Sequence, residues 1–120
     1  MYVQGFLVPV LPGKRDAYIE MAREAGALFQ GYGALEIVET IEADIPDGEH
    51  TDFRKAVKAE DGEQIVFSWV VWPDKETCDK AAAAMEEDGE MSMPDEMPFA
   101  GKRLIYGGFT PIYTMGRERG

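Results

Sequence analysis

The segment Gln64–Trp72, with the sequence QIVFSWVVW, constrains the fold most strongly, because it predicts a strand that is apolar on both faces. Successive side chains of a strand point to opposite faces of its sheet. One face would carry Ile65, Phe67, Trp69 and Val71, and the other Val66, Val70 and Trp72. The segment Tyr2–Leu11 repeats this two-sided pattern. An antiparallel sheet with one solvated face should alternate apolar and polar residues, so both faces of this sheet are predicted to be covered.

The order of the predicted elements is β-α-β-β-α-β. Strands are predicted over 2–11, 34–44, 64–72 and 102–113, and helices over 14–30 and 75–88. Asp74 is placed to cap the second helix, and Gly89 to end it. This order is that of the ferredoxin-like fold, an α+β arrangement with both helices on one face of a four-stranded antiparallel sheet. The 120 residues are expected to form one domain over 1–114, followed by a polar tail at 115–120.

Three connecting features complete the predicted chain. The polar segment 45–63 carries turn signals at both ends and a short extended piece at Phe53–Lys58. An acidic loop rich in methionine is predicted over Glu90–Pro98. Two adjacent glycines, Gly107 and Gly108, interrupt the last strand and predict either a bulge or the close approach of another backbone.

The second apolar face of the sheet has no covering element left in the chain. Two helices of about 10 Å diameter cover only one face of a sheet roughly 19 Å wide. We therefore expect a second copy of the chain to pack sheet against sheet, which would make the protein a homodimer and the pair of sheets a dimeric α/β barrel.

The charge of the chain excludes several classes of partner. Twelve basic residues against 23 acidic ones give a formal net charge of −11, which repels phosphate groups. Nucleic acids and membranes are therefore not predicted as partners, and no apolar run approaches the roughly 18 residues of a membrane span. Cys78 is the only cysteine, so no intrachain disulfide can form, and a reducing cytoplasm is the predicted location.

The sequence lacks the motifs of phosphate, dinucleotide and metal sites. Gly101-Lys102-Arg103 departs from the phosphate-binding loop, because Arg103 replaces the magnesium-binding hydroxyl and the glycine leads into a strand. The glycines at 31 and 33 follow a helix instead of a strand, which is the reverse of a dinucleotide fingerprint. His50 is the only histidine, and Cys78 is expected to face the core. No metal and no cofactor is predicted.

Polar side chains on otherwise apolar strands are the best candidates for a ligand site. The predicted pocket residues are Glu36, Phe67, Trp69, Arg103 and Tyr106. Ligand pockets are mostly apolar and contain a few converging polar groups, a description that fits this set. Arg103 could bind a carboxylate or pair with Glu36, and Tyr106 could donate a hydrogen bond. The alternative is a structural salt bridge and a core tyrosine.

Two functions remain open from the residues alone. The first is a dimer that binds or converts a small organic molecule in a pocket between sheet and helices. The second is a structural or regulatory dimer without a ligand. No catalytic residue is predicted, and the residues do not show whether the protein is an enzyme.

Five stretches resemble the YbaA-like bacterial family of unknown function. They are YVQGF, GALEIVE, PDGEHTDFRKAVKAE, VFSWVVWP and MPFAGKRLIYGGF, which together span Tyr2 to Phe109. The resemblance implies a ferredoxin-like protomer and a place in the dimeric α/β-barrel superfamily. It implies no reaction, because that superfamily contains enzymes as well as plain binding modules.

Overall fold

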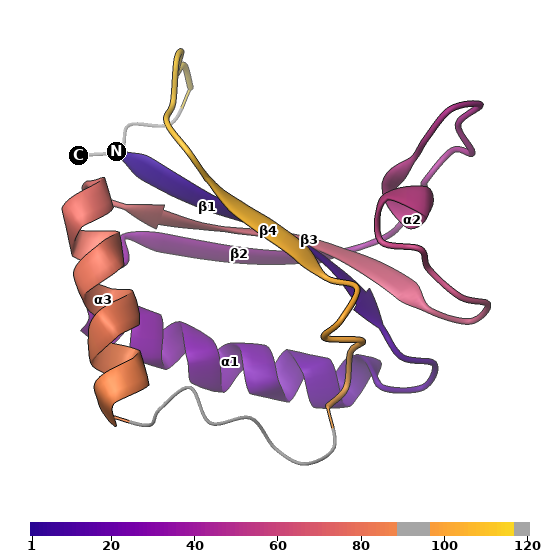
Figure 1. The fold of residues 1–120 in the computed structure, drawn as a ribbon, viewed down its shortest axis with the longest axis horizontal. Helices are drawn as coiled ribbons and strands as arrows, with labels where there is room; N and C mark the ends of the chain where they lie inside the picture. Colours follow the sequence, from indigo (N-terminus) through magenta and orange to yellow (C-terminus); the bar gives the residue numbers. More distant parts are fainter. Residues whose placement is uncertain (89–96, 117–120) are drawn as a thin grey trace.

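The computed structural model describes residues 1–88 and 97–116. The elements are β1 (Tyr2–Val10), α1 (Arg15–Gly31), β2 (Glu36–Ile41), α2 (Phe53–Ala56), β3 (Gln64–Trp72), α3 (Lys75–Asp88) and β4 (Ile105–Phe109) (Figure 1). The predicted helix end at Gly89, most of the loop Glu90–Pro98 and residues 117–120 of the predicted tail lie outside the described residues.

The four strands form one antiparallel sheet in the order β2-β3-β1-β4. The two long strands lie at its centre, with Tyr2 opposite Trp72 and Val10 opposite Gln64. The short strands β2 and β4 form the edges. This topology is that of the ferredoxin-like fold, and it confirms the predicted α+β class.

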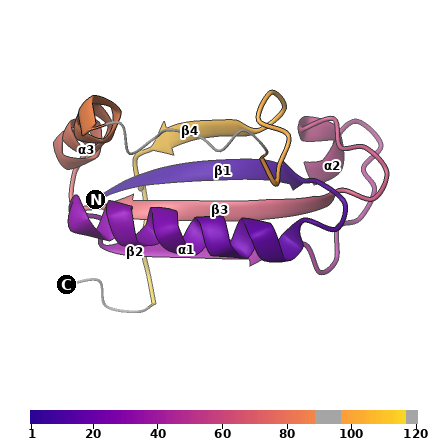
Figure 2. The same cartoon turned by 90° about the horizontal axis from the view of Figure 1, so that it is seen from below.

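Helices α1 and α3 lie on the same side of the sheet, whereas α2 lies in the excursion beyond one end of the strands (Figures 1 and 2). The predicted cap of α3 is present, since a carboxylate oxygen of Asp74 accepts a 2.7 Å hydrogen bond from the Thr77 backbone. After α1 the chain turns at Gly33, whose φ of +109° suits glycine. Among the described residues, no helix is both long and apolar enough to cross a membrane.

The core fills the layer between the sheet and the two long helices. The sheet contributes alternate residues of its central strands, of which Trp72, only 1% exposed, is the largest fully buried one. The buried side chains of this layer are Val8, Val10, Tyr18, Val66, Val70, Trp72, Cys78, Ala81, Met85 and Phe99. Cys78 packs here as its helical spacing predicts.

The opposite face of the sheet is apolar and largely open. Phe67 is 46% exposed, Ile105 46% and Phe109 60%, and Phe53 of α2 packs against Phe67 at one end. A shallow depression of about 270 Å³ runs between these rings. The sheet is therefore two-sided in its chemistry, as the strand sequences predict, and we call its outward surface the open face.

The glycine pair of β4 sits in regular strand pairing. Gly107 lies opposite Gly5, and Gly108 lies opposite Gln4, with no residue inserted in the register. The predicted alternative of a bulge is therefore wrong. Because these glycines have no Cβ, neighbouring side chains can pack against their backbone. The Phe109 ring would touch a Cβ at Gly5 or Gly107, and the Tyr2 hydroxyl occupies the place of a Cβ at Gly108.

The piece Phe53–Lys58, predicted to be extended, instead contains the short helix α2. Asp52 explains the difference, because its carboxylate caps this turn, accepting 2.7 Å and 3.0 Å hydrogen bonds from the backbone of Lys55 and Gly48. The Arg54 side chain then ties the excursion to the sheet by a 2.9 Å ion pair with Glu42.

The last strand is shorter than the predicted 102–113. It begins at Ile105, because the preceding residues turn and Arg103 is held by Glu63 through bonds of 2.8 and 2.7 Å. It ends at Phe109, opposite Val3 near the start of β1, and Pro111 cannot donate a further backbone hydrogen bond.

Candidate functional site

A cavity of about 590 Å³ lies between the sheet and the helices α1 and α3. Its size falls within the range of small-molecule sites. Most of its lining is apolar or aromatic, including Phe6, Phe29 and Trp72. Polar side chains line it from β1, β2, β3, α1, β4 and α3, namely Gln4, Glu39, Ser68, Tyr18, Tyr106 and Glu86. This is the composition expected of a ligand pocket, an apolar chamber with a few polar groups.

Three side-chain hydrogen bonds position polar groups of this cavity. The Trp72 indole Nε1 donates to the Gln4 side-chain oxygen over 2.8 Å, across the paired strands β3 and β1. The Tyr18 hydroxyl donates to Glu39 Oε1, also over 2.8 Å, and so joins α1 to the edge strand β2. The Ser68 hydroxyl forms a second side-chain hydrogen bond with Glu39. These contacts hold one amide and one carboxylate in defined positions at the sheet surface.

The environment raises the pKa of both partners in the Tyr18–Glu39 pair. Burial, and then the charge of Glu39, raise the pKa of Tyr18 well above its ordinary value, so the phenol stays protonated as the donor. Burial of the carboxyl group raises the pKa of Glu39 and outweighs the opposing hydrogen bonds from Tyr18 and Ser68. Glu39 as a whole residue is exposed on the edge strand, so this shift reflects the inward position of its carboxyl end.

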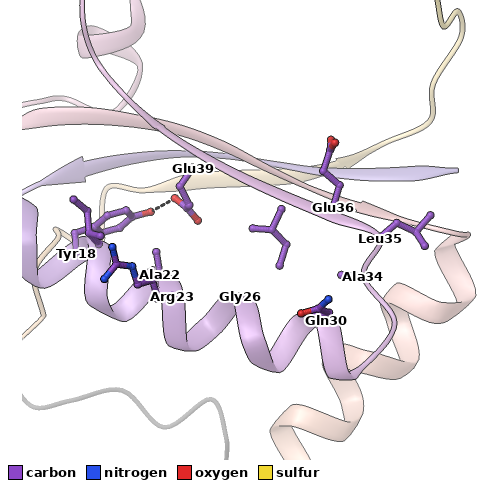
Figure 3. A pocket seen from close by; sticks show the side chains of 11 residues that line it. Tyr18, Ala22, Arg23, Gly26, Gln30, Ala34, Leu35, Glu36 and Glu39 are labelled. Carbon is purple, nitrogen blue, oxygen red and sulfur yellow. Dashed lines mark hydrogen bonds between the residues drawn. The ribbon is translucent and has the colours of Figure 1, made fainter. Parts of the chain in front are cut away.

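A second hollow, about 510 Å³ in volume, lies outside the cavity between α1 and β2 (Figure 3). Tyr18 and Glu39 point toward one another at one end of this groove, and Arg23 and Gln30 line its helical side. Tyr18 and Glu39 are also the two residues that the groove shares with the inner cavity. The hydrogen-bonded pair therefore forms the partition between the two spaces.

The sequence-predicted pocket residues do not converge on this cavity. Tyr106 alone lines it, stacked against Phe6 with ring centroids 6.2 Å apart. Phe67 and Trp69 lie on the open face, 5.5 Å apart between ring centroids. Glu36 shares that side of the sheet, where its carboxylate accepts a 3.4 Å hydrogen bond from Trp69 Nε1.

Arg103 lies on the loop before β4 and not in the cavity. It pairs with Glu63, whose side chain is 1% exposed, and it donates a further 2.8 Å bond to the Lys58 carbonyl. Its predicted partner Glu36 lies on β2, at the edge of the sheet opposite β4. Arg103 therefore forms a structural salt bridge, which was the alternative to a ligand contact.

Sequence reasoning missed Tyr18, Glu39 and Trp72 as cavity residues. A signal for Glu39 was present in the alternation of β2, because Glu36 and Glu42 share one parity and Glu39 the other, together with Ile37 and Ile41. A carboxylate between two inward-facing isoleucines must lie against the helices. Tyr18 belongs to the apolar stripe of α1, where a hydroxyl also needs an inward partner.

No group of three or more metal-binding side chains occurs in residues 1–88 and 97–116. The carboxylates of the described cavity lining are those of Glu39 and Glu86.

Fold and cavity together define a ferredoxin-like α+β protein with a ligand-sized chamber beneath its helices. Residues 1–101 match the sequence profile described as "Protein of unknown function (DUF1428)". The chain belongs to this family.

Curated relatives agree with that assignment. "Uncharacterized protein YbaA" of Escherichia coli K12 is 54% identical over 112 residues, which cover 92% of this chain and 96% of the relative. The protein of the same name in Shigella flexneri matches to the same extent.

Among solved structures, a mutant of MhuD with two manganese protoporphyrin IX molecules bound per active site has a similar fold. Its TM-score is 0.53 at 14% sequence identity, and the match covers 96% of this chain and 99% of that one. At this identity the likeness supports the ferredoxin-like fold alone.

Proposed function

We propose that the protein is a homodimer that binds a small organic molecule in the cavity between the sheet and the helices α1 and α3. The observation that carries this proposal is the 590 Å³ cavity itself, which is rich in aromatic side chains and contains a hydrogen-bonded carboxylate. A concave chamber of this size, lined mostly by apolar side chains with a few polar groups, is typical of small-molecule sites.

The open face supports the dimer. Phe67, Ile105 and Phe109 are exposed on it, and they lie beside the half-buried Leu7 and Trp69. Contiguous apolar surface of this kind marks an interaction site, and a second copy offers the same surface in return. Beyond β4 the chain exposes Ile112, Tyr113 and Met115, which adds apolar surface for the same partner. We propose a cytoplasmic location, because the single cysteine suits a reducing compartment.

The porphyrin named for the MhuD structure raises the question of whether this cavity could hold a haem. Haem iron is bound by histidine, cysteine thiolate, methionine or tyrosinate, and its propionates need cations. The described lining contains no histidine, lysine or arginine. Met21 and Met85 line the cavity, but methionine binds haem iron together with a histidine, and no described lining residue is a histidine. Burial raises the pKa of the Cys78 thiol and of the Tyr18 phenol, so the thiolate and the tyrosinate that would bind iron are both disfavoured. Glu39 and Glu86 would also repel the propionates. The residues do not fit a haem.

Native mass spectrometry of freshly purified protein tests the proposal. We expect twice the mass of the 13.4 kDa chain, with a small molecule retained on part of the population. A dimer that retains nothing, and that binds no neutral apolar dye such as Nile red, would favour the structural dimer without a ligand. A monomer at micromolar concentration would contradict the proposed assembly.

A matched pair of substitutions on α3 locates the binding site. Both Ala82 and the neighbouring Ala83 are exposed, but only Ala82 lines the cavity. Ala82→Phe should fill the chamber and abolish dye binding, while Ala83→Phe should leave it unchanged. Equal dye binding by both variants would place the dye elsewhere and would contradict the cavity as the site.

A further inference from the structure

The ionisable groups of the cavity are of one sign. Glu39 from β2 and Glu86 from α3 line it, and no described lining residue is a lysine, arginine or histidine. Arg103 directly precedes the lining residue Leu104, but its guanidinium pairs with Glu63 at 2.7 Å. Arg23 lines the outer groove and pairs with Glu20 at 3.5 Å. A carboxylate or phosphate ligand would meet repulsion here without a compensating cation.

The remaining lining is suited to a positive charge. Six aromatic side chains surround the chamber: Phe6, Tyr18, Phe29, Trp72, Phe99 and Tyr106. Aromatic faces carry a negative potential that attracts organic cations, most strongly where water is excluded. The same rings bury the apolar part of a ligand, so one lining serves both ends of an amphipathic amine.

Glu39 is positioned to receive a donor from such a ligand. An ionised carboxylate offers about four acceptor positions. Tyr18 occupies one position and Ser68 another, which leaves acceptor capacity at the point where the carboxylate meets the cavity. A charge-assisted hydrogen bond to an ammonium group would be stronger than either neutral donor can supply.

We propose that the cavity selects an apolar organic cation, a primary amine on an aryl or alkyl body, and that Glu39 is the residue that determines this selectivity. The inference rests on the proposed ligand-binding function and adds the charge and class of the ligand. Trp72 and Gln4, which are joined by a hydrogen bond, also line the cavity, and the apolar body of the ligand would contact the Trp72 ring.

Three probes with one body and different heads test the proposal by calorimetric titration at neutral pH. They are 4-phenylbutylamine, 4-phenylbutan-1-ol and 4-phenylbutanoate. We expect the amine to bind roughly tenfold or more tightly than the alcohol, as for an added charge-assisted hydrogen bond, and the acid to bind most weakly. Glu39→Gln should reduce the affinity for the amine to that for the alcohol and leave the affinity for the alcohol unchanged. Glu24→Gln, which removes the same charge from the exposed side of α1, should change neither.

The outcomes separate this inference from the function on which it rests. If the acid or the alcohol binds as tightly as the amine, the assignment of ligand class is overturned while the cavity remains a binding site. If Glu39→Gln keeps the preference for the amine, the role of Glu39 in selectivity is overturned. If none of the probes binds and Nile red does not bind either, both proposals fail. Circular dichroism of Glu39→Gln confirms that any loss of affinity is not a loss of folding.

Discussion

Arg103 and Glu63 are joined by two parallel hydrogen bonds, of 2.8 and 2.7 Å, which connect the loop before β4 to the residue that precedes β3. The Glu63 side chain is 1% exposed, so its charge depends on this partner. Removal of one member of a buried ion pair leaves an uncompensated charge, which is far more costly than the pair itself is stabilising.

Arg103→Ala should therefore lower the free energy of unfolding by about 3 kcal/mol, as measured by urea denaturation. The matched control is Arg23→Ala, which breaks an exposed 3.5 Å pair with Glu20 and should cost less than about 1 kcal/mol. Similar losses in the two variants would contradict the structural role of Arg103.

The pH dependence of stability should report the same pair. The hydrogen bond from Arg103 is the main reason that the pKa of Glu63 lies below its usual value. The stabilisation is thus complete above the ordinary glutamate pKa of about 4.3, and it is lost as the pH falls through the lower pKa of the folded state. Urea denaturation between neutral and acidic pH should show this loss in the wild type. It should be shallower in Glu63→Gln, where Asp52 and Asp74, whose pKa values are also lowered, still contribute.

Glu39→Gln should stabilise the protein at neutral pH. Folding raises the pKa of Glu39, so the folded state holds its proton longer, and stability falls as the pH rises from about 4.3 through the raised pKa. The glutamine keeps an acceptor for Tyr18 without the buried charge. We expect a gain below about 1 kcal/mol, because solvent reaches the edge strand. Thermal unfolding at pH 7 and pH 4 checks this, and a gain of equal size at both pH values would contradict the electrostatic origin.

The affinity for 4-phenylbutylamine should increase with pH through the pKa of Glu39, because the ammonium group needs the ionised carboxylate. Glu39 faces Tyr18 of α1 and Ser68 of β3, with Arg23 on the groove side. Of these, Tyr18 stays protonated over this range, because burial raises the pKa of its phenol. Glu86 of α3 is the other carboxylate of the described lining, so Glu86→Gln should keep the increase if Glu39 is its source. Titrations from pH 4 to pH 8 should show the increase for the amine and none for the alcohol. The same increase for both probes would indicate a change elsewhere in the protein.

Ile105→Lys should dissociate the dimer. Ile105 is 46% exposed on the open face, and a lysine there would place a charge in the proposed interface. Sedimentation velocity at micromolar concentration should show a monomer. Ile19→Lys makes the same substitution at a side chain of α1 that is 37% exposed, and it should leave the dimer intact. Dimers in both variants would contradict an interface through the open face.

The fold could be predicted from the sequence because hydrophobic periodicity carries most of the information for the long elements. Strand β3 and the Asp74 cap of α3 are confirmed at the predicted residues. The helix α2 could not be found in this way, because four residues are too few for a period, and its cause is the side chain of Asp52.

The candidate site was harder to predict than the fold. The sequence indicates which polar residues lie on strands. Which of them come together in one site depends on the order of the strands in the sheet and on the face that each residue occupies. Arg103 illustrates the limit, since its partner Glu63 lies forty residues away in a segment predicted to be a solvated connection. Glu39 was within reach, because its parity in β2 differs from that of Glu36.

The ring of Phe109 lies over Gly5 and Gly107, where two paired strands have no side chains of their own. It thereby shields a strip of bare backbone at the edge strand β4. A small residue at position 109 would expose that backbone on the open face and remove the packing over the β1–β4 pairing. Loss of this one ring should thus loosen the edge strand, whereas a charge at Ile105 should leave the sheet intact and give a single chain in solution.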